Sequence, residues 1–151
     1  MELKFEDFNK KYIPELNGWQ EEEHSRGQSG IADYVGDGEV LLGDYLDYVA
    51  SEMGIETKIV LSEDRAVGFV SYVKKKGNEI YIEIIGVSPH ERGKNLSEKI
   101  MAQLKELAGD SEKYKVTFRV KNTNVGGLKS FSRFARKNED LTSGDYFGFE
   151  F

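Results

Sequence analysis

The sequence predicts an α/β fold with one mixed sheet, and three observations support this prediction. Apolar residues recur at helical spacing in the first 55 residues, and they form extended runs from Glu56 onward. A strand, a tight turn, a helix and another strand then follow one another between residues 80 and 121. Such a unit places its two strands parallel in one sheet. We therefore expect one domain over residues 1–151, a length that suits a single packed core.

The first part of the chain predicts a short edge strand near residues 3–8 and a helix from Ile13 to Glu23, with Pro14 in its first turn. Residues 24–38 contain four glycines and predict a long loop, which in a compact domain is functional or disordered. A second helix is expected over residues 39–53. Its apolar face would consist of Leu42, Tyr45, Leu46, Val49 and Met53, with Gly54 at its end.

Three β-rich runs at residues 57–61, 66–73 and 80–87 predict an antiparallel meander, because a short polar hairpin signal joins the first two. A helix follows from Leu96, with Gly109 after its last turn. The apolar face of this helix would carry Leu96, Ile100, Leu104 and Leu107.

The last part of the chain predicts a strand over residues 114–121, a short helix that begins after Asn124, and an aromatic strand over 145–151. The terminal strand would either complete the sheet of its own chain or support a homodimer. The predicted element order is β-α-α-β-β-β-α-β-α-β.

The composition, 38% hydrophobic and 32% charged, is that of a folded globular protein. No apolar run reaches the length that a bilayer requires, and the first residues do not resemble a secretory signal, so we expect a cytoplasmic protein without a membrane partner. The chain contains no cysteine, which excludes disulfides, thiolate metal sites and a cysteine nucleophile.

The net charge of −6 is unevenly distributed along the chain. Residues 1–55 carry 13 acidic and 4 basic side chains, whereas residues 56–151 carry 14 and 17. An acidic first part would attract a cationic acceptor, and a mildly basic second part would suit a cofactor that carries phosphate. A solvated helix face explains Glu21–Glu23 equally well. No basic stripe predicts a nucleic-acid partner.

The turn over residues 88–95 joins the strand that ends at Val87 to the helix that begins at Leu96. A turn of this kind directs backbone N–H groups and the positive end of the helix dipole toward one point, which favours an anion. An ordinary strand-to-helix turn explains the same residues if Gly93 supplies flexibility and Asn95 caps the helix.

The spacing Arg92-x-x-Asn95-x-Ser97, preceded by Val87-x-Pro89, resembles the pyrophosphate-binding signature of the GNAT superfamily of N-acetyltransferases. The predicted element order is also that of this family, including its splayed parallel pair of strands. The family usually has glycine where this chain has Asn95, and glycine or alanine in place of Ser97. Asparagine adopts positive φ more readily than most residues and serine is small, so close approach of a pyrophosphate stays possible, with weaker binding.

The resemblance implies acetyl-CoA as co-substrate. Its pyrophosphate would be held by the backbone of six consecutive residues, namely Arg92, Gly93, Lys94, Asn95, Leu96 and Ser97. Backbone groups of Ile85 and Val87 would pair with the pantetheine arm, and the Val87 N–H would polarise the thioester carbonyl. Asn124 matches an asparagine of the family and would either hold the pantetheine or cap the next helix.

Phe131 occupies the position of the family's tyrosine, which often protonates the departing thiolate. The resemblance therefore implies that this acid is missing, and water, Ser130 or Ser132 would replace it. The loss also fits a domain that binds acyl-CoA without efficient catalysis.

Glu83 interrupts an otherwise apolar strand, and a period of two places it on the same face as Ile85 and Val87. A carboxylate on a covered strand has the environment that a general base needs. Several amine acetyltransferases of the family have a glutamate at this offset, so the resemblance implies a base at Glu83. A structural acid that faces solvent is the alternative.

The predicted function is acetyl transfer from acetyl-CoA to the primary amine of a small cationic acceptor, similar to a polyamine or an aminoglycoside. The alternatives are a protein or peptide N-acetyltransferase and a non-catalytic acyl-CoA-binding regulatory module. We expect no metal, because Glu21–His24 do not share a helix face. Phosphate contacts by His90, Lys129 and Arg133 are weaker hypotheses than simple solvation.

Overall fold

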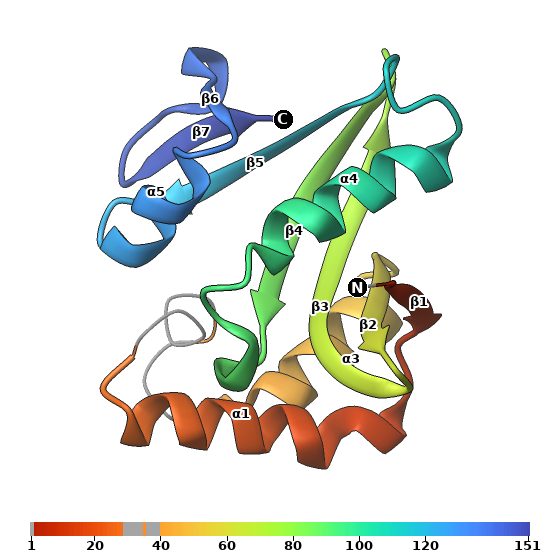
Figure 1. Ribbon diagram of the computed structural model, residues 1–151, viewed down its shortest axis with the longest axis vertical. Helices are drawn as coiled ribbons and strands as arrows, with labels where there is room; N and C mark the ends of the chain where they lie inside the picture. The colour runs from red at the N-terminus through yellow and green to blue at the C-terminus, as the bar shows by residue number, and fades with distance from the viewer. Residues whose placement is uncertain (1, 29–34, 36–39) are drawn as a thin grey trace.

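The computed structural model describes residues 2–28, 35 and 40–151. Over these residues the strands form a seven-stranded sheet in the order β1-β2-β3-β4-β5-β7-β6 (Figure 1). The predicted α/β class and mixed sheet are confirmed. Most of the predicted loop over residues 24–38 lies outside the described residues, although the helix before it extends to Ser25.

The first half of the sheet is the predicted antiparallel meander, in which each strand pairs with the next. Glu63 and Asp64 both have positive φ, 52° and 62°, as the central residues of a two-residue hairpin turn with the twist of the strands. The predicted edge strand and hairpin are therefore confirmed. The bounds are β1 Lys4–Asp7, β2 Glu56–Ser62, β3 Arg65–Lys75 and β4 Glu79–Val87.

β4 and β5 (Lys115–Lys121) form the predicted parallel pair, and they pair at three positions from Glu79↔Lys115 to Tyr81↔Thr117. Beyond these positions the two strands separate, and Figure 1 shows them diverging toward the end where α5 lies. β5 then pairs with β7 (Tyr146–Glu150), so the aromatic terminal strand completes the sheet of its own chain. A short strand, β6 (Arg136–Lys137), pairs with β7 and was not predicted, since two residues show no periodicity.

The helices cover both faces of the sheet, and each face has its own apolar core. On one face α4 (Leu96–Ala108) packs with side chains of β3, β4 and β5. On the other, α1 (Ile13–Ser25) and α3 (Leu42–Ser51) pack with side chains of β2, β3 and β4. α5 (Val125–Phe131) follows β5 at the open end of the splay (Figure 1). None of the described helices is long and apolar enough to cross a membrane.

Two residues of the predicted helix faces are exposed instead. Met53 is 52% exposed because α3 ends at Ser51, and helical periodicity no longer applies to it. Leu107 is 61% exposed, and Ala108 takes the inward position in the last turn of α4.

A β-bulge in β4 reverses the alternation of side chains at the centre of the sheet. Ser71 pairs with Ile84 but Tyr72 pairs with Ile82, so Glu83 is the extra residue. Ile82 and Ile85 consequently belong to the core under α4, whereas Ile84 belongs to the opposite core. The prediction that Glu83 shares a face with Ile85 and Val87 is wrong, since the bulge breaks the period of two.

Candidate active site

The turn before α4 contains two residues in the left-handed conformation. Gly93 and Asn95 both have positive φ, 83° and 58°. Asn95 makes no side-chain hydrogen bond to the helix, so it supplies the left-handed conformation and does not act as a side-chain cap. The first N–H groups of an α-helix have no acceptor within the helix, and the first three residues of α4, Leu96, Ser97 and Glu98, line a cavity. The expectation that asparagine adopts positive φ at this position is confirmed.

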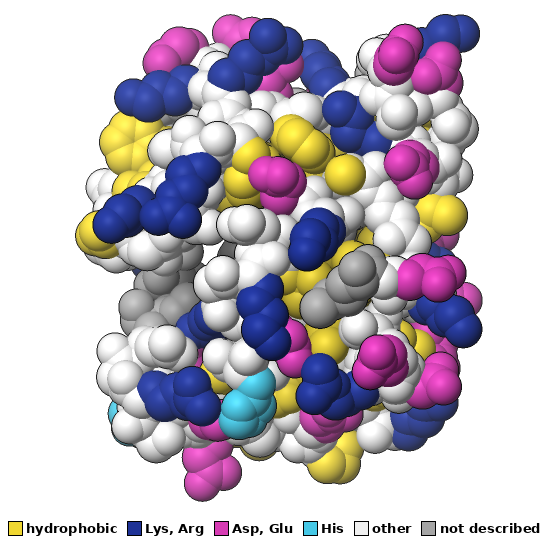
Figure 2. Space-filling view, in the orientation of Figure 1, with side chains coloured by type: hydrophobic (Ala, Val, Ile, Leu, Met, Phe, Trp, Pro, Cys, Tyr) yellow, Lys and Arg dark blue, Asp and Glu magenta, His cyan; other side chains and the backbone are white. Residues whose placement is uncertain are grey.

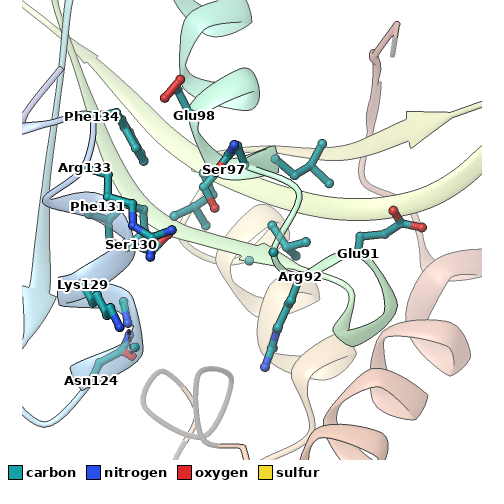
Figure 3. Close-up of a pocket in the computed structure, with 18 of the residues that line it drawn as sticks. Glu91, Arg92, Ser97, Glu98, Asn124, Lys129, Ser130, Phe131, Arg133 and Phe134 are labelled. Atoms are coloured by element: carbon teal, nitrogen blue, oxygen red, sulfur yellow. Dashed lines mark hydrogen bonds between the residues drawn. The ribbon is translucent and has the colours of Figure 1, made fainter.

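This turn borders a cavity of about 590 Å³ between the end of β4, the start of α4, and α5 (Figure 3). Nine of the predicted cofactor-binding residues line it, namely Ile85, Val87, Arg92, Gly93, Asn95, Leu96, Ser97, Asn124 and Phe131. The structure thus brings together residues that are separated by up to 46 positions in sequence. Lys94 is the exception: it does not line the cavity, and its ammonium lies 3.0 Å from a carboxylate oxygen of Glu91.

The Arg92 side chain links the turn to the end of α1. Its guanidinium donates to the carboxylate of Glu23, whose side chain is only 2% exposed, and to Gln28 Oε1 at 2.9 Å. His90 also contacts α1, since its Nε2 lies 2.8 Å from a carboxylate oxygen of Glu22. These contacts hold the Arg92 side chain, and with it the turn, against the end of α1.

Glu91 is a buried acid beneath the same turn. Its carboxylate accepts hydrogen bonds from Arg65 at 2.8 Å and from Lys94 at 3.0 Å, while its side chain is 4% exposed. The hydrogen bond from Lys94 lowers the pKa of Glu91, and the positive charges of Lys94 and Arg65 add to this effect against the opposite effect of burial. The ion pairs connect the turn to the start of β3. An isolated acid in a turn has no periodic signal, so the burial of Glu91 could not be predicted from the sequence.

Asn124 caps α5, and its Oδ1 accepts a hydrogen bond from the Gly127 N–H at 2.9 Å. This is one of the two roles expected for it. Phe131 is 8% exposed and packs against Phe118 and Phe134, with ring centroids 4.9 and 5.8 Å away. A phenyl ring carries no proton to donate, so this position cannot supply an acid.

The two serines proposed to replace the missing acid differ in their positions. The Ser132 hydroxyl donates to the Leu128 carbonyl at 2.6 Å, and Ser132 does not line the cavity. Ser130 does line it. Of the two, only Ser130 is placed to exchange a proton with a ligand there.

Basic side chains border the cavity on the side of α5. Lys129 of α5 and Arg133, in the turn after α5, line it, and Figure 3 shows the Arg133 side chain extending toward Ser97. On the face seen in Figure 2, Lys and Arg side chains stand out in the centre and along the left edge, where Figure 1 places α4 and α5. Together with the positive end of α4, these charges favour an anionic ligand.

A second cavity, of about 210 Å³, lies on the other side of the splay, between α3, β4, β5 and β7. Glu83 is exposed and lines this cavity with Arg119 and Lys121 of β5. Asn124 lines both cavities, so the two meet beside the N-terminus of α5. The structure therefore places Glu83, the candidate base, beside the larger cavity but not within it.

Three aromatic residues, Tyr45, Tyr81 and Tyr146, complete the polar lining of the second cavity. Burial raises the pKa of Tyr45, and the nearby charge of Glu83 adds to the increase. Sequence reasoning missed Arg119 and Tyr146 as site residues. Each lies on a predicted strand, but only the order of strands in the sheet brings them opposite Glu83. Among the described residues, no group of three or more His, Asp and Glu side chains is arranged to hold a metal.

The architecture matches known acetyltransferases. The PaiA N-acetyltransferase of Thermoplasma acidophilum, solved with coenzyme A, has a TM-score of 0.67 at 15% identity, with 99% of this chain and 98% of that chain covered. The spermidine N-acetyltransferase of Vibrio cholerae, solved with CoA and spermine, has 0.66 at 10% identity, with coverage of 99% and 94%. The N-acetyltransferase PseH of Campylobacter jejuni, solved with acetyl coenzyme A, has 0.62 at 12% identity, with coverage of 99% and 98%.

Because these sequence identities are low, the structural likeness by itself establishes the fold and nothing further. The sequence matches none of the curated proteins with which it was compared. The model of the acetyltransferase (GNAT) family matches residues 7–134, which is most of the chain. The family model, the fold and the spacing of the turn before α4 all indicate the same family. The chain belongs to the GNAT family of acetyltransferases.

Proposed function

We propose that this protein transfers the acetyl group of acetyl-CoA to the primary amine of a small molecule. The observation that carries the proposal is the composition of the larger cavity, which is lined by all the predicted cofactor-binding residues except Lys94. Its volume of about 590 Å³ lies in the range of cofactor sites in proteins. The CoA and acetyl-CoA bound to the similar structures support the same ligand.

The residues present fit the charge of this co-substrate. The backbone of the turn and the first N–H groups of α4 would hold the pyrophosphate, because the N-terminus of a helix offers unpaired N–H groups and a positive dipole end to an anion. Lys129 and Arg133 would add positive charge from the opposite wall. Ile85 and Val87 would pair with the pantetheine arm along the edge of β4 that the splay leaves open.

Acetyl-CoA supplies an activated thioester, whose C–S bond breaks as the C–N bond of the amide forms. Glu83 would accept a proton from the acceptor ammonium, directly or through water. The Val87 N–H would donate to the thioester carbonyl oxygen, where negative charge develops. Ser130 or water would protonate the departing thiolate, since Phe131 has no proton to give.

The size of the second cavity favours a small acceptor. At about 210 Å³ it suits a small molecule better than the open groove that a protein N-terminus requires. Two of the similar structures are spermidine N-acetyltransferases, which supports a small amine. A cytoplasmic location stays a prediction from the sequence.

A non-catalytic acyl-CoA-binding module is the second candidate, and the specific observation that favours it is Phe131. Turnover separates the two functions. We expect the thiol of CoA to be released from acetyl-CoA only when an amine is added. Glu83→Gln should lower kcat by about 10²- to 10⁴-fold and should remove the rise of the rate with pH that a general base causes. Glu106→Gln, an exposed change on α4 outside both cavities, is the matched control. Binding of acetyl-CoA without release of thiol with any amine would favour the binding module.

A further inference from the structure

We propose that the acceptor is a small amine that also carries a carboxylate or phosphate group, and that Arg119 and Lys121 bind this acidic group while Glu83 binds the ammonium. The inference rests on the proposed function and specifies its substrate class. It follows from three charged side chains that line the second cavity.

The sheet explains why these opposite charges stand apart. β4 and β5 pair as far as Tyr81↔Thr117. Glu83 and Arg119 each lie two residues further along, so they would be lateral neighbours in a continuous parallel sheet. Because the strands separate at this point, the two side chains line opposite sides of the opening instead. The splay thus creates a space that is bounded by a carboxylate on one strand and a guanidinium on the next.

None of these three charges is neutralised within the described part of the chain. Glu83, Arg119 and Lys121 make no ion pair within 4.0 Å to any described residue, in contrast to Glu22, Glu23 and Glu91. The Arg119 guanidinium lies instead over the Tyr146 ring, 4.6 Å from its centroid. This cation–π contact holds the positive charge at the cavity wall and leaves its N–H groups available to a ligand.

The same lining disfavours a polyamine. A second ammonium group would meet Arg119 and Lys121, which repel it. Four acids of the first part of the chain do not compensate, because Glu6, Asp7, Glu22 and Glu23 are paired with basic groups elsewhere. An amine with an acidic group satisfies both signs of charge, so it fits better than the polyamine-like acceptor that the overall charge suggested.

Matched acceptors test this inference. We would measure kcat/KM with acetyl-CoA for 5-aminopentanoate, 1-aminopentane and 1,5-diaminopentane, which share a five-carbon chain, and for shorter amino acids and 2-aminoethyl phosphate. We expect an acid-bearing amine to exceed the plain amine and the diamine by about tenfold or more. The selectivity ratio is kcat/KM for the acid-bearing amine divided by kcat/KM for the plain amine. Arg119→Gln should lower this ratio by about ten- to hundredfold, mainly by raising KM for the acid-bearing amine. Arg119→Glu should shift the preference toward the diamine.

Lys115→Gln is the matched control, since Lys115 is an exposed base on the same strand but lies outside the cavity. It should leave the ratio unchanged. A preference for the plain amine or the diamine that Arg119→Glu does not alter would overturn the inference and leave the acetyltransferase function intact. Acetyl-CoA binding without turnover of any amine, and without a shift in Tm when amino acids are added to the CoA-saturated protein, would overturn both.

Discussion

The buried carboxylate of Glu23, in the last turns of α1, accepts a hydrogen bond from the guanidinium of Arg92 in the turn before α4. The two residues are 69 positions apart, and their contact attaches the candidate pyrophosphate turn to the helix on the other side of the sheet. Arg92 therefore fixes the position of the turn through its side chain.

Replacing Arg92 by Gln should destabilise the protein and weaken acetyl-CoA binding together, because the turn loses its connection to α1. A double-mutant cycle of Glu23→Gln and Arg92→Gln should give a coupling free energy of about 1–3 kcal/mol in urea denaturation. The exposed pair Glu22–Arg26 is the comparison, and it should give roughly 0.3–0.5 kcal/mol. Additive effects at Glu23 and Arg92 would contradict the proposed link.

Asn95 should tolerate glycine and resist β-branched residues, because its φ is 58°. Asn95→Gly is expected to change the free energy of unfolding little, whereas Asn95→Val should lower it by about 1–2 kcal/mol. Asn122→Val, at an exposed position outside the left-handed residues, is the control. Equal losses at positions 95 and 122 would mean that backbone conformation does not explain the asparagine.

Gly86 should resist alanine, because a Cβ there would overlap the ring of Phe69, which is completely buried. We expect Gly86→Ala to lower the free energy of unfolding by about 1–3 kcal/mol, and the added Phe69→Leu change to recover part of the loss. Gly18→Ala on α1 is the matched control. It should raise the free energy of unfolding, since nothing lies within 4 Å of the new methyl group. Helix propensity predicts a gain of up to about 1 kcal/mol there. If Gly86→Ala is as stable as the wild type, β4 or the Phe69 ring can shift to make room for the methyl group, and the predicted overlap is not costly.

Glu91 should make stability depend on pH in the acid range. Its pKa in the folded protein is lowered from 4.5, so its contribution is present above pH 4.5 and is lost as pH falls through the folded pKa. Glu91→Gln should lower the free energy of unfolding at pH 7 by about 1–3 kcal/mol. The difference between wild type and variant should shrink as pH falls below 4.5. A constant difference from pH 7 to pH 3 would show that the charge of Glu91 is not the cause.

Most of the fold could be predicted from sequence, because its long elements have strong periodicity. The helix from Leu96 and the three meander strands bury one face each, and the two left-handed positions in the turn carry Gly93 and Asn95. The orientation of Glu83 could not be predicted in this way. A bulge adds one residue without any change in composition, so a period of two assigns the wrong face to the side chains beyond it.

The residues of the larger cavity were easier to predict than those of the second cavity for a physical reason. The residues of the turn are consecutive and carry a spacing, whereas Glu83, Arg119 and Tyr146 come together only through the order of the strands. Similarly, the buried partners of Arg92 and Lys94 were not expected, since a long-range ion pair has no signature in the sequence.

The central claim is that the N-terminus of α4 holds the pyrophosphate of acetyl-CoA, and Ser97→Asp tests it most directly. An acid in the first turn of a helix stabilises the free protein slightly, so a loss of binding would not reflect unfolding. We would titrate acetyl-CoA by calorimetry and measure Tm with and without it. Saturation at about a hundred times Kd should stabilise the wild type by ~2.7 kcal/mol, and Ser97→Asp should bind at least about tenfold more weakly with an unchanged or higher Tm in the free state. Equal affinity in both proteins, or no binding by the wild type, would contradict the claim.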